Sequence, residues 1–208
     1  MKTIFLFDIK SRFQKWGFYI LLLLIVALGF IGGQNARFSV SENIFLNSPY
    51  QISFITTFLS LTTILFSTIF ASQLLFKEAD ARFELLLFST PVKRRQYLLG
   101  RYAALFAISV VCVLLLIIVF FIGQSFGKFA GNKTSFVLSY YLYPIVLFAF
   151  INTLFTTSVL SCVGWFTKNK LLVYVSGLLL YIVYMVALMY SGSPLMAQSM
   201  PQSEPVSY

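Results

Sequence analysis

The stretch YAALFAISVVCVLLLIIVFFIGQSFG (residues 102–127) contains no charged residue. A helix needs about 20 mostly apolar residues to cross a bilayer, and this stretch is long enough. The chain has four more charge-free windows of spanning length, at 17–36, 43–76, 134–167 and 171–203. A charge at the centre of a spanning helix costs roughly 2.5–3.5 kcal/mol, so the absence of charges from these windows is informative. We expect membrane-spanning helices near 17–33, 51–76, 101–123, 139–166 and 171–191.

The composition of the whole chain also indicates a membrane protein. Only 10% of the residues are charged and 59% are hydrophobic, whereas soluble domains contain about 25% charged residues. The net charge of +9 does not indicate a nucleic-acid partner, because the basic residues lie between apolar segments. Histidine is absent, and Cys112 and Cys162 lie inside apolar runs, which argues against a metal site or a disulfide framework. We therefore expect an all-α, polytopic helical membrane protein.

The distribution of Lys and Arg predicts the orientation of the chain in the membrane. If the N-terminus is cytoplasmic, twelve basic residues lie inside, and only Arg37, Lys128 and Lys133 lie outside. This is a strong positive-inside bias. We expect residues 1–16 to form a cytoplasmic interfacial helix and residues 17–191 to form the transmembrane domain. The expected location is a bacterial-type cytoplasmic (inner) membrane.

The last segment of the chain differs from the spans. Residues 192–208 contain Pro194, Pro201 and Pro205 among several Ser and Gln residues, a composition typical of a loop or linker. With five spans and a cytoplasmic N-terminus, this segment lies outside the cell. We expect the parent chain to be longer and to include at least a sixth spanning helix.

The segment KTIFLFDIKSRFQKW (residues 2–16) has the pattern of an amphipathic helix. Its apolar residues recur at helical spacing from Phe5 to Trp16, and Asp8 falls on the opposite side. Such a helix lies in the membrane interface, with its apolar side among the acyl chains and its basic flanks among the lipid phosphates. It serves either as a simple basic anchor or as a lever that also contacts a cytoplasmic partner.

The segment FELLLFSTPVKRRQYLLGRY (residues 83–102) joins the second and third predicted spans on the cytoplasmic side. We expect the second helix to continue toward Phe88 and to end before Pro91, because the residue that precedes a proline disfavours helical geometry. Pro91 then suits the first position of a short transverse helix over 91–97. By charge alone, the basic residues from Lys93 to Arg95 are ordinary positive-inside residues beside anionic lipid.

The order of residues in this segment resembles the signature region of ABC-2 type transporter permeases. In that family an acidic residue, a Leu-rich turn, a Thr-Pro break, a basic or polar helix and a Leu-Gly-Lys/Arg step follow one another. The sequence LLLF stands where the family usually has a glycine. The matching residues are Glu84, Leu86, Thr90, Pro91, Arg94, Leu99, Gly100 and Arg101.

The resemblance implies a permease subunit of an ATP-driven transporter, with export as the expected direction. It implies a second permease protomer and a separate ATPase subunit that binds ATP and magnesium. This chain would then be no enzyme and would hold no cofactor. The loop 77–100 would be the cytoplasmic coupling element, in which Glu84 is a candidate partner for Arg94 or Arg101. The residues expected to contact the ATPase are Glu84, Thr90, Pro91, Lys93, Arg94, Arg95, Gly100 and Arg101.

Hydroxyl side chains form a stripe on the second predicted span. Thr56, Ser60, Thr63 and Ser67 recur at steps of 4, 3 and 4 and so share one helix face. The fourth span carries further polar residues, among them Asn152 and Thr156. Small polar residues favour close helix packing in membranes, but they can also form the polar wall of a translocation path. Both interpretations remain open, and Asn152 is the most informative residue because a buried amide needs a partner.

Sequence motifs of catalysis are absent. The chain has no P-loop, GxSxG or HExxH motif, and none of its six acidic residues lies in the middle of a span. Proton-coupled carriers usually need such an acid, so the energy for transport should come from outside the chain. The alternative hypothesis is a membrane anchor for a downstream catalytic domain, for example a metallopeptidase. The substrate classes open to a permease are lipid, polysaccharide, peptide and drug.

Overall fold

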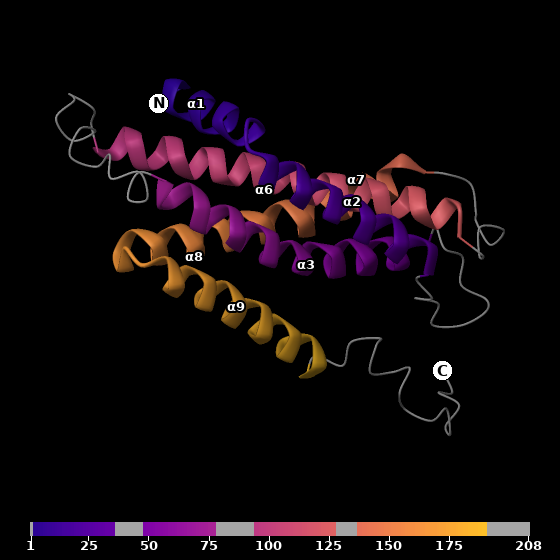
Figure 1. The fold of residues 1–208 in the computed structure, drawn as a ribbon. Helices are drawn as coiled ribbons and strands as arrows, with labels where there is room; N and C mark the ends of the chain where they lie inside the picture. Colours follow the sequence, from indigo (N-terminus) through magenta and orange to yellow (C-terminus); the bar gives the residue numbers. More distant parts are fainter. Residues whose placement is uncertain (1, 36–47, 78–93, 128–136, 191–208) are drawn as a thin grey trace.

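The computed structural model describes residues 2–35, 48–77, 94–127 and 137–190, which are helical and contain no strand (Figure 1). Five helical segments of the described residues are long and apolar enough to cross a membrane. The fourth of them, Leu138–Thr167, consists of three consecutive helical pieces. The structure thus confirms the predicted all-α polytopic fold with five spans. The elements are α1 (Lys2–Phe13), α2 (Trp16–Asn35), α3 (Pro49–Leu75), α6 (Arg94–Ser125), α7 (Leu138–Pro144), the π-helix η1 (Ile145–Phe150), α8 (Ile151–Thr167) and α9 (Lys170–Tyr190).

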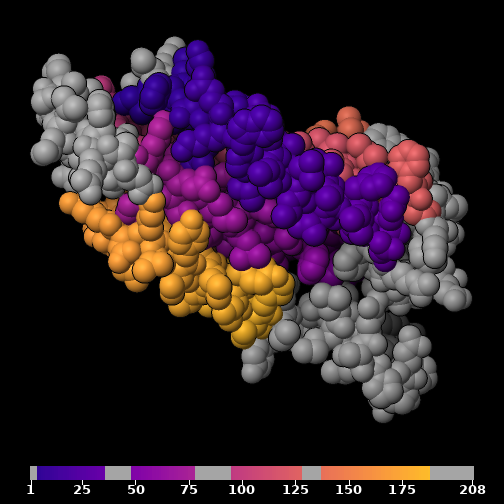
Figure 2. All heavy atoms as spheres, viewed as in Figure 1, coloured from indigo at the N-terminus to yellow at the C-terminus, as the bar shows by residue number. Residues whose placement is uncertain are grey.

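Helix α3 lies at the centre of the bundle. It contacts α6, α8 and α9, whereas α2 lies along α6 (Figure 1). In its most apolar stretch 67% of the residues are buried, against 11% for α9, which forms one flank of the molecule (Figure 2). Helices α3 and α8 run in the same direction, because Ser60 contacts Asn152 and Leu75 lies beside Gly164. The core therefore forms around α3.

The contact between α2 and α6 depends on glycines. Gly29 and Gly33 are spaced as in the GxxxG pattern, which lets helix backbones approach closely. A Cβ atom at Gly33 would overlap the carbonyl oxygen of Phe120. On the other helix, a Cβ at Gly123 would lie 2.5 Å from the carbonyl oxygen of Phe30. Neither position has room for a side chain, so the two backbones are in direct contact.

The fourth span contains a π-helical segment that the sequence analysis did not predict. Pro144 ends α7, and the next six residues form η1 before regular α-helix resumes in α8. Proline lacks a backbone N–H, and its ring clashes with the carbonyl of the residue four positions earlier. A π-helical turn is one way in which a helix accommodates such a break. We predicted one uninterrupted helix over 139–166, although Pro144 marked the break.

A short turn at Lys168 and Asn169 joins α8 to α9. Lys168 ends α8 in the left-handed conformation (φ 49°), and its N–H donates to the carbonyl of Gly164 at 3.2 Å. The side-chain oxygen of Asn169 then accepts a hydrogen bond from the N–H of Leu171 at 3.0 Å. This bond satisfies a free N–H in the first turn of α9, as helix-capping residues do. The two helices are thus antiparallel neighbours.

The third span differs from the prediction at its start. We expected a short helix over 91–97 that is separate from the third span, but α6 is continuous from Arg94 to Ser125. Residues 94–101 are mostly good helix formers, so the helix has no local reason to break there. Helix α3 ends at Leu75, where Phe76 leaves helical geometry (φ −107°, ψ 12°). The predicted continuation toward Phe88 and the start of the transverse helix at Pro91 lie outside the described residues.

Candidate functional site

A buried carboxylate joins three helices at the end of the bundle that carries α1. One side-chain oxygen of Asp8 lies 3.6 Å from the Nζ atom of Lys77, which follows α3. The other lies 3.8 Å from the Nε atom of Arg101, in the second turn of α6. The side chains of Asp8 and Arg101 are only 3% and 4% exposed. We call Asp8, Lys77 and Arg101 the Asp8 cluster.

Neighbouring groups hold the two cations of the Asp8 cluster in place. The Nζ atom of Lys77 donates a hydrogen bond to the hydroxyl of Ser11 at 2.8 Å and lies 4.3 Å from the centre of the Phe7 ring. Arg101 donates to the carbonyl oxygen of Leu75 at 3.2 Å, and this bond links the start of α6 to the end of α3. Each cation therefore has a second partner besides the carboxylate.

Arg12 makes a second connection between α1 and α3. Its guanidinium donates to the side-chain carbonyl of Gln73 and to the backbone carbonyl of Phe70, the latter at 3.3 Å. Like Asp8, Arg12 is buried. Arginine suits this position because its planar group can donate several hydrogen bonds at once. Helix α1 is therefore docked onto the bundle by polar contacts.

Burial acts against the positive charges at this end of the bundle. Desolvation lowers the pKa of Lys77, although the nearby carboxylate of Asp8 raises it in part. Desolvation also lowers the pKa of Arg12, and Asp8 again opposes the shift. A buried cation is stable only when it is paired or well hydrogen-bonded. Asp8 therefore supplies the negative charge that offsets these cations.

The location of Asp8 differs from the amphipathic pattern predicted for α1. We placed Asp8 on the side opposite the apolar stripe, but Asp8 and Arg12 are 3% and 5% exposed. Phe13 and Trp16, which belong to the apolar stripe, are 49% and 84% exposed. In a membrane-embedded helix bundle, charged residues face the protein interior and apolar side chains can face lipid. The amphipathic pattern did not predict that the side of α1 with Asp8 faces the other helices of the bundle.

The residues predicted to contact an ATPase fall into three groups. Glu84, Thr90, Pro91 and Lys93 lie outside the described residues. Arg94 and Arg95 begin α6, and Arg95 is exposed. Gly100 and Arg101 are buried, and Arg101 pairs with Asp8 inside the chain. The sequence analysis missed this pairing, although Asp8 is the only acidic residue in the basic segment before the first span.

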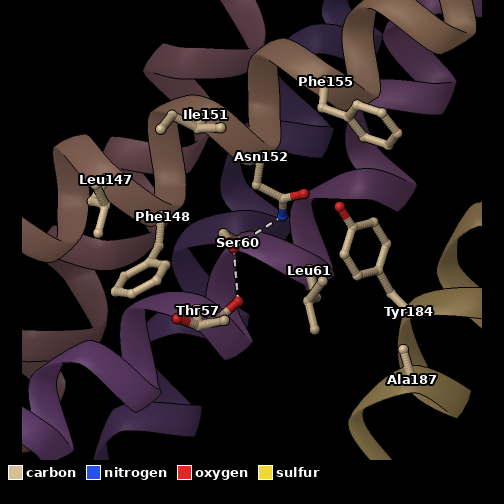
Figure 3. Close-up of a pocket in the computed structure, with 10 residues that line it drawn as sticks. All are labelled: Thr57, Ser60, Leu61, Leu147, Phe148, Ile151, Asn152, Phe155, Tyr184 and Ala187. Carbon is tan, nitrogen blue, oxygen red and sulfur yellow. Dashed lines mark hydrogen bonds between the residues drawn. The ribbon is translucent and has the colours of Figure 1, made fainter. Parts of the chain in front are cut away.

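The polar residues of the second and fourth spans meet at the middle of the bundle. The amide nitrogen of Asn152 in α8 donates to the hydroxyl of Ser60 in α3 at 3.0 Å, and Ser60 donates to the carbonyl of Thr57 at 2.7 Å (Figure 3). The structure therefore brings together the residue that we considered most informative and one member of the hydroxyl stripe. The remaining candidates are also buried in the bundle, namely Thr56, Thr63, Ser67 and Thr156.

A cavity of about 540 Å³ lies beside this hydrogen bond, between α3, the η1–α8 segment and α9. The hydroxyl of Tyr184, on α9, points toward the amide of Asn152 (Figure 3). The sequence analysis did not single out Tyr184, because α9 also contains Tyr174, Tyr181 and Tyr190 and no local pattern distinguishes the four. The lining residues are Thr57, Ser60, Leu61, Leu147, Phe148, Ile151, Asn152, Phe155, Tyr184 and Ala187.

Comparison with known proteins identifies the family of the chain. A family model described as ABC-2 family transporter protein matches residues 9–188, which include all five spans. No curated protein and no solved structure matches the chain significantly. The match covers most of the sequence and agrees with the resemblance carried by residues 84–101. The chain is an integral membrane protein and belongs to the ABC-2 transporter family, whose members of this type are transmembrane components and not catalytic subunits.

Proposed function

We propose that this chain is the permease subunit of an ATP-driven ABC-2 transporter and that a separate ATPase subunit docks on the loop 77–100. The ATPase would bind ATP and magnesium, and two permease protomers would form the path for an exported substrate. The family match and the five spans support the permease role. The docking of the ATPase is supported by the arrangement of charged residues around the loop.

The Asp8 cluster is the observation that carries this proposal. Asp8 contacts Lys77 directly before the undescribed part of the loop and Arg101 shortly after it. Both ends of the loop are therefore tied to one carboxylate of α1. A displacement of the loop by a partner would act on α3, α6 and α1 together, because packed helices joined by polar contacts can transmit coupling between sites. An ATPase-driven permease needs such a mechanical connection.

The distribution of charge supports a cytoplasmic location for this end of the bundle, in a bacterial-type inner membrane. The end of α3, the start of α6 and the α8–α9 turn lie at the same end as α1 (Figure 1). All Lys and Arg residues in the described ranges belong to segments at this end. By the positive-inside rule, that end faces the cytoplasm.

The proposal is tested by reversing two charges at the start of α6. We expect Arg94→Glu with Arg95→Glu to weaken co-purification with the ATPase subunit and to uncouple ATP hydrolysis from transport. The reason is that charge-assisted hydrogen bonds to acidic residues of the partner would be replaced by repulsion. Membrane insertion should be retained, because ten other basic residues on the same side still set the topology.

A matched control reverses the same amount of charge at the same end but outside the loop. Lys168→Glu with Lys170→Glu changes the α8–α9 turn and should leave assembly and coupling close to those of the unmodified protein. If the Arg94 and Arg95 variant keeps full assembly and full coupling, these charges serve only as a lipid-facing anchor and the docking proposal fails.

A further inference from the structure

The cavity beside Asn152 has the size and position of a ligand site. Its volume of about 540 Å³ falls within the range of about 300–1,000 Å³ that small-molecule pockets occupy. Ser60 and Asn152 lie near the middle of α3 and of the segment Leu138–Thr167. A molecule in this cavity would therefore lie at mid-depth in the spanning helices, far from the loop 77–100.

The lining determines which chemistry the cavity can accept. None of its lining residues is charged, and most are apolar, so a charged ligand would lose its hydration without gaining a counter-ion. Hydrogen-bonding groups gather on one wall, where the hydroxyl of Tyr184 faces the Asn152–Ser60 pair (Figure 3). The Oδ1 atom of Asn152 is buried and accepts no hydrogen bond within the described ranges. This wall therefore has an unused acceptor beside a hydroxyl group.

The exposure of the apolar wall shows where a ligand can enter. Leu147, Ile151 and Phe155 line the cavity and are 41%, 56% and 48% exposed on the outside of the bundle. The opening therefore faces sideways, at the depth where lipid chains surround spanning helices. A ligand that enters by this route must be soluble in hydrocarbon, which again excludes a charged molecule.

We propose that this cavity binds an uncharged, mainly apolar molecule that carries one hydroxyl group. Its chain lies against Leu147, Ile151 and Phe155, and its hydroxyl hydrogen-bonds to Tyr184 beside the Asn152–Ser60 pair. Two sources share this chemistry, namely a membrane lipid with a free hydroxyl and a free long-chain alcohol. The site is distinct from the ATPase contact and does not depend on it.

The test uses photolabelling of the purified full chain without any ATPase. The photoprobes are a diazirine-bearing long-chain alcohol, the alkane of the same length, and the same chain with a trimethylammonium head. We expect the alcohol to label the lining positions 147, 148, 151, 155, 184 and 187 about fivefold more than either of the other probes does. One hydrogen bond in this setting changes the affinity by roughly that factor. Labelling of Val110, Val113 and Leu114 (within residues 110–114), which line a smaller apolar cavity, reports non-selective partition.

Two variants separate recognition from loss of folding. Tyr184→Phe removes only the hydroxyl and should reduce alcohol labelling about fivefold, whereas Tyr181→Phe, on the same helix but outside the lining, should not. Ala187→Phe fills the space and should abolish labelling by the alcohol at these residues. Retained labelling of residues 110–114 and an unchanged elution profile show that each variant is folded.

Competition then distinguishes the sources. Displacement by diacylglycerol in nanodiscs assigns the site to a lipid, and displacement by dodecanol alone assigns it to a free small molecule. Equal labelling by alcohol and alkane, or unchanged labelling in Tyr184→Phe and Ala187→Phe, overturns the proposal. Absence of labelling together with cross-links between two copies through residues 151 or 155 also overturns it, because a second copy then covers the cavity.

Discussion

The carboxylate of Asp8 lies 3.8 Å from the guanidinium of Arg101, and both side chains are almost completely buried. Asp8 belongs to α1 and Arg101 to α6, so this pair joins the first helix of the chain to the third span. An interfacial helix that is only adsorbed to lipid needs no such contact. Helix α1 is instead a docked part of the bundle, and its removal would leave buried cations without their carboxylate.

The first prediction concerns this pair. Asp8→Asn keeps the size of the side chain and removes the negative charge that Asp8 provides to the buried Arg101. Breaking a buried ion pair in this way costs about 3–5 kcal/mol, so we expect a large decrease in thermal stability. The measurement is thermal unfolding of the purified protein. Lys10→Gln, at an exposed position of the same helix, is the control and should change stability little.

A double-mutant cycle isolates the contact between the two residues. Asp8→Asn and Arg101→Gln should each be destabilising, and the double variant should be much less so than the sum of the two. Interaction energies of about 0.5–3 kcal/mol are typical of residues in direct contact. Simple additivity of the two effects would show that the pair contributes nothing of its own.

The second prediction concerns the glycine contact between α2 and α6. Gly33→Ala introduces a methyl group that overlaps the carbonyl oxygen of Phe120, whereas Gly32→Ala places its methyl 3.6 Å from the Phe120 ring, an ordinary contact. We expect the first substitution to destabilise the protein by about 1–3 kcal/mol, as overpacking does. The second should be close to neutral. Thermal unfolding of the two variants side by side provides the check, and equal effects would contradict the packing described here.

The third prediction concerns the hydrogen bond between Asn152 and Ser60. Ser60→Ala removes the acceptor and should lower stability by about 0.6–2 kcal/mol, the range for hydrogen bonds between membrane helices. Thr62→Val is the control, because Thr62 donates to the carbonyl of Phe58 within its own helix. If the pair only packs helices, transport per folded molecule stays normal. Reduced transport with intact stability would instead assign the pair to a translocation path, and Asn152→Leu is the sharpest variant for this comparison.

The fourth prediction concerns topology. Single cysteines at positions 93 and 133, in a background without Cys112 and Cys162, should be modified from opposite sides of the membrane. An impermeant reagent added outside should label position 133 but not position 93. The reverse pattern would place the N-terminus outside and would move the loop 77–100 away from any cytoplasmic ATPase. Both positions lie in segments outside the described residues, so the test depends only on their side of the membrane.

The spans could be predicted well from the sequence, because each one is a long window of apolar residues without charge. A charge-free window of 20 residues or more has few alternatives to a spanning helix. The first, second, fourth and fifth predicted helices agree with the observed ones to about two residues at each end, whereas the third observed helix begins earlier, at Arg94. The misplaced boundaries have local causes. The π-helical segment follows Pro144, and no breaker separates Arg94 from the third span. Pro144 and the lack of a helix breaker after Arg94 could both be read in the sequence. Their effect on the helix boundaries is harder to predict than the effect of a long apolar window.

The candidate site was harder to predict, because it depends on which helices become neighbours. The spacing of the hydroxyl stripe indicated one buried face, and Ser60 and Asn152 do meet. Nothing local showed that Asp8 would meet Arg101, since residues from distant segments come together only in the folded bundle. Hydrophobicity also fails as a guide to burial in α1, where Asp8 is buried and Trp16 is exposed.

The hydroxyl groups of α3 have a consequence for the order in which the protein is made. Ser60, Thr63, Thr68 and Ser72 each donate to a carbonyl three or four residues earlier in α3. Because the chain is synthesised from its N-terminus, α3 enters the membrane before α8 exists. These four hydroxyl donors are satisfied within the helix during that interval, and the Ser60 oxygen accepts from Asn152 only after α8 has formed. These four residues of α3 can therefore reside in lipid without a donor-side partner on another helix until the fourth span arrives.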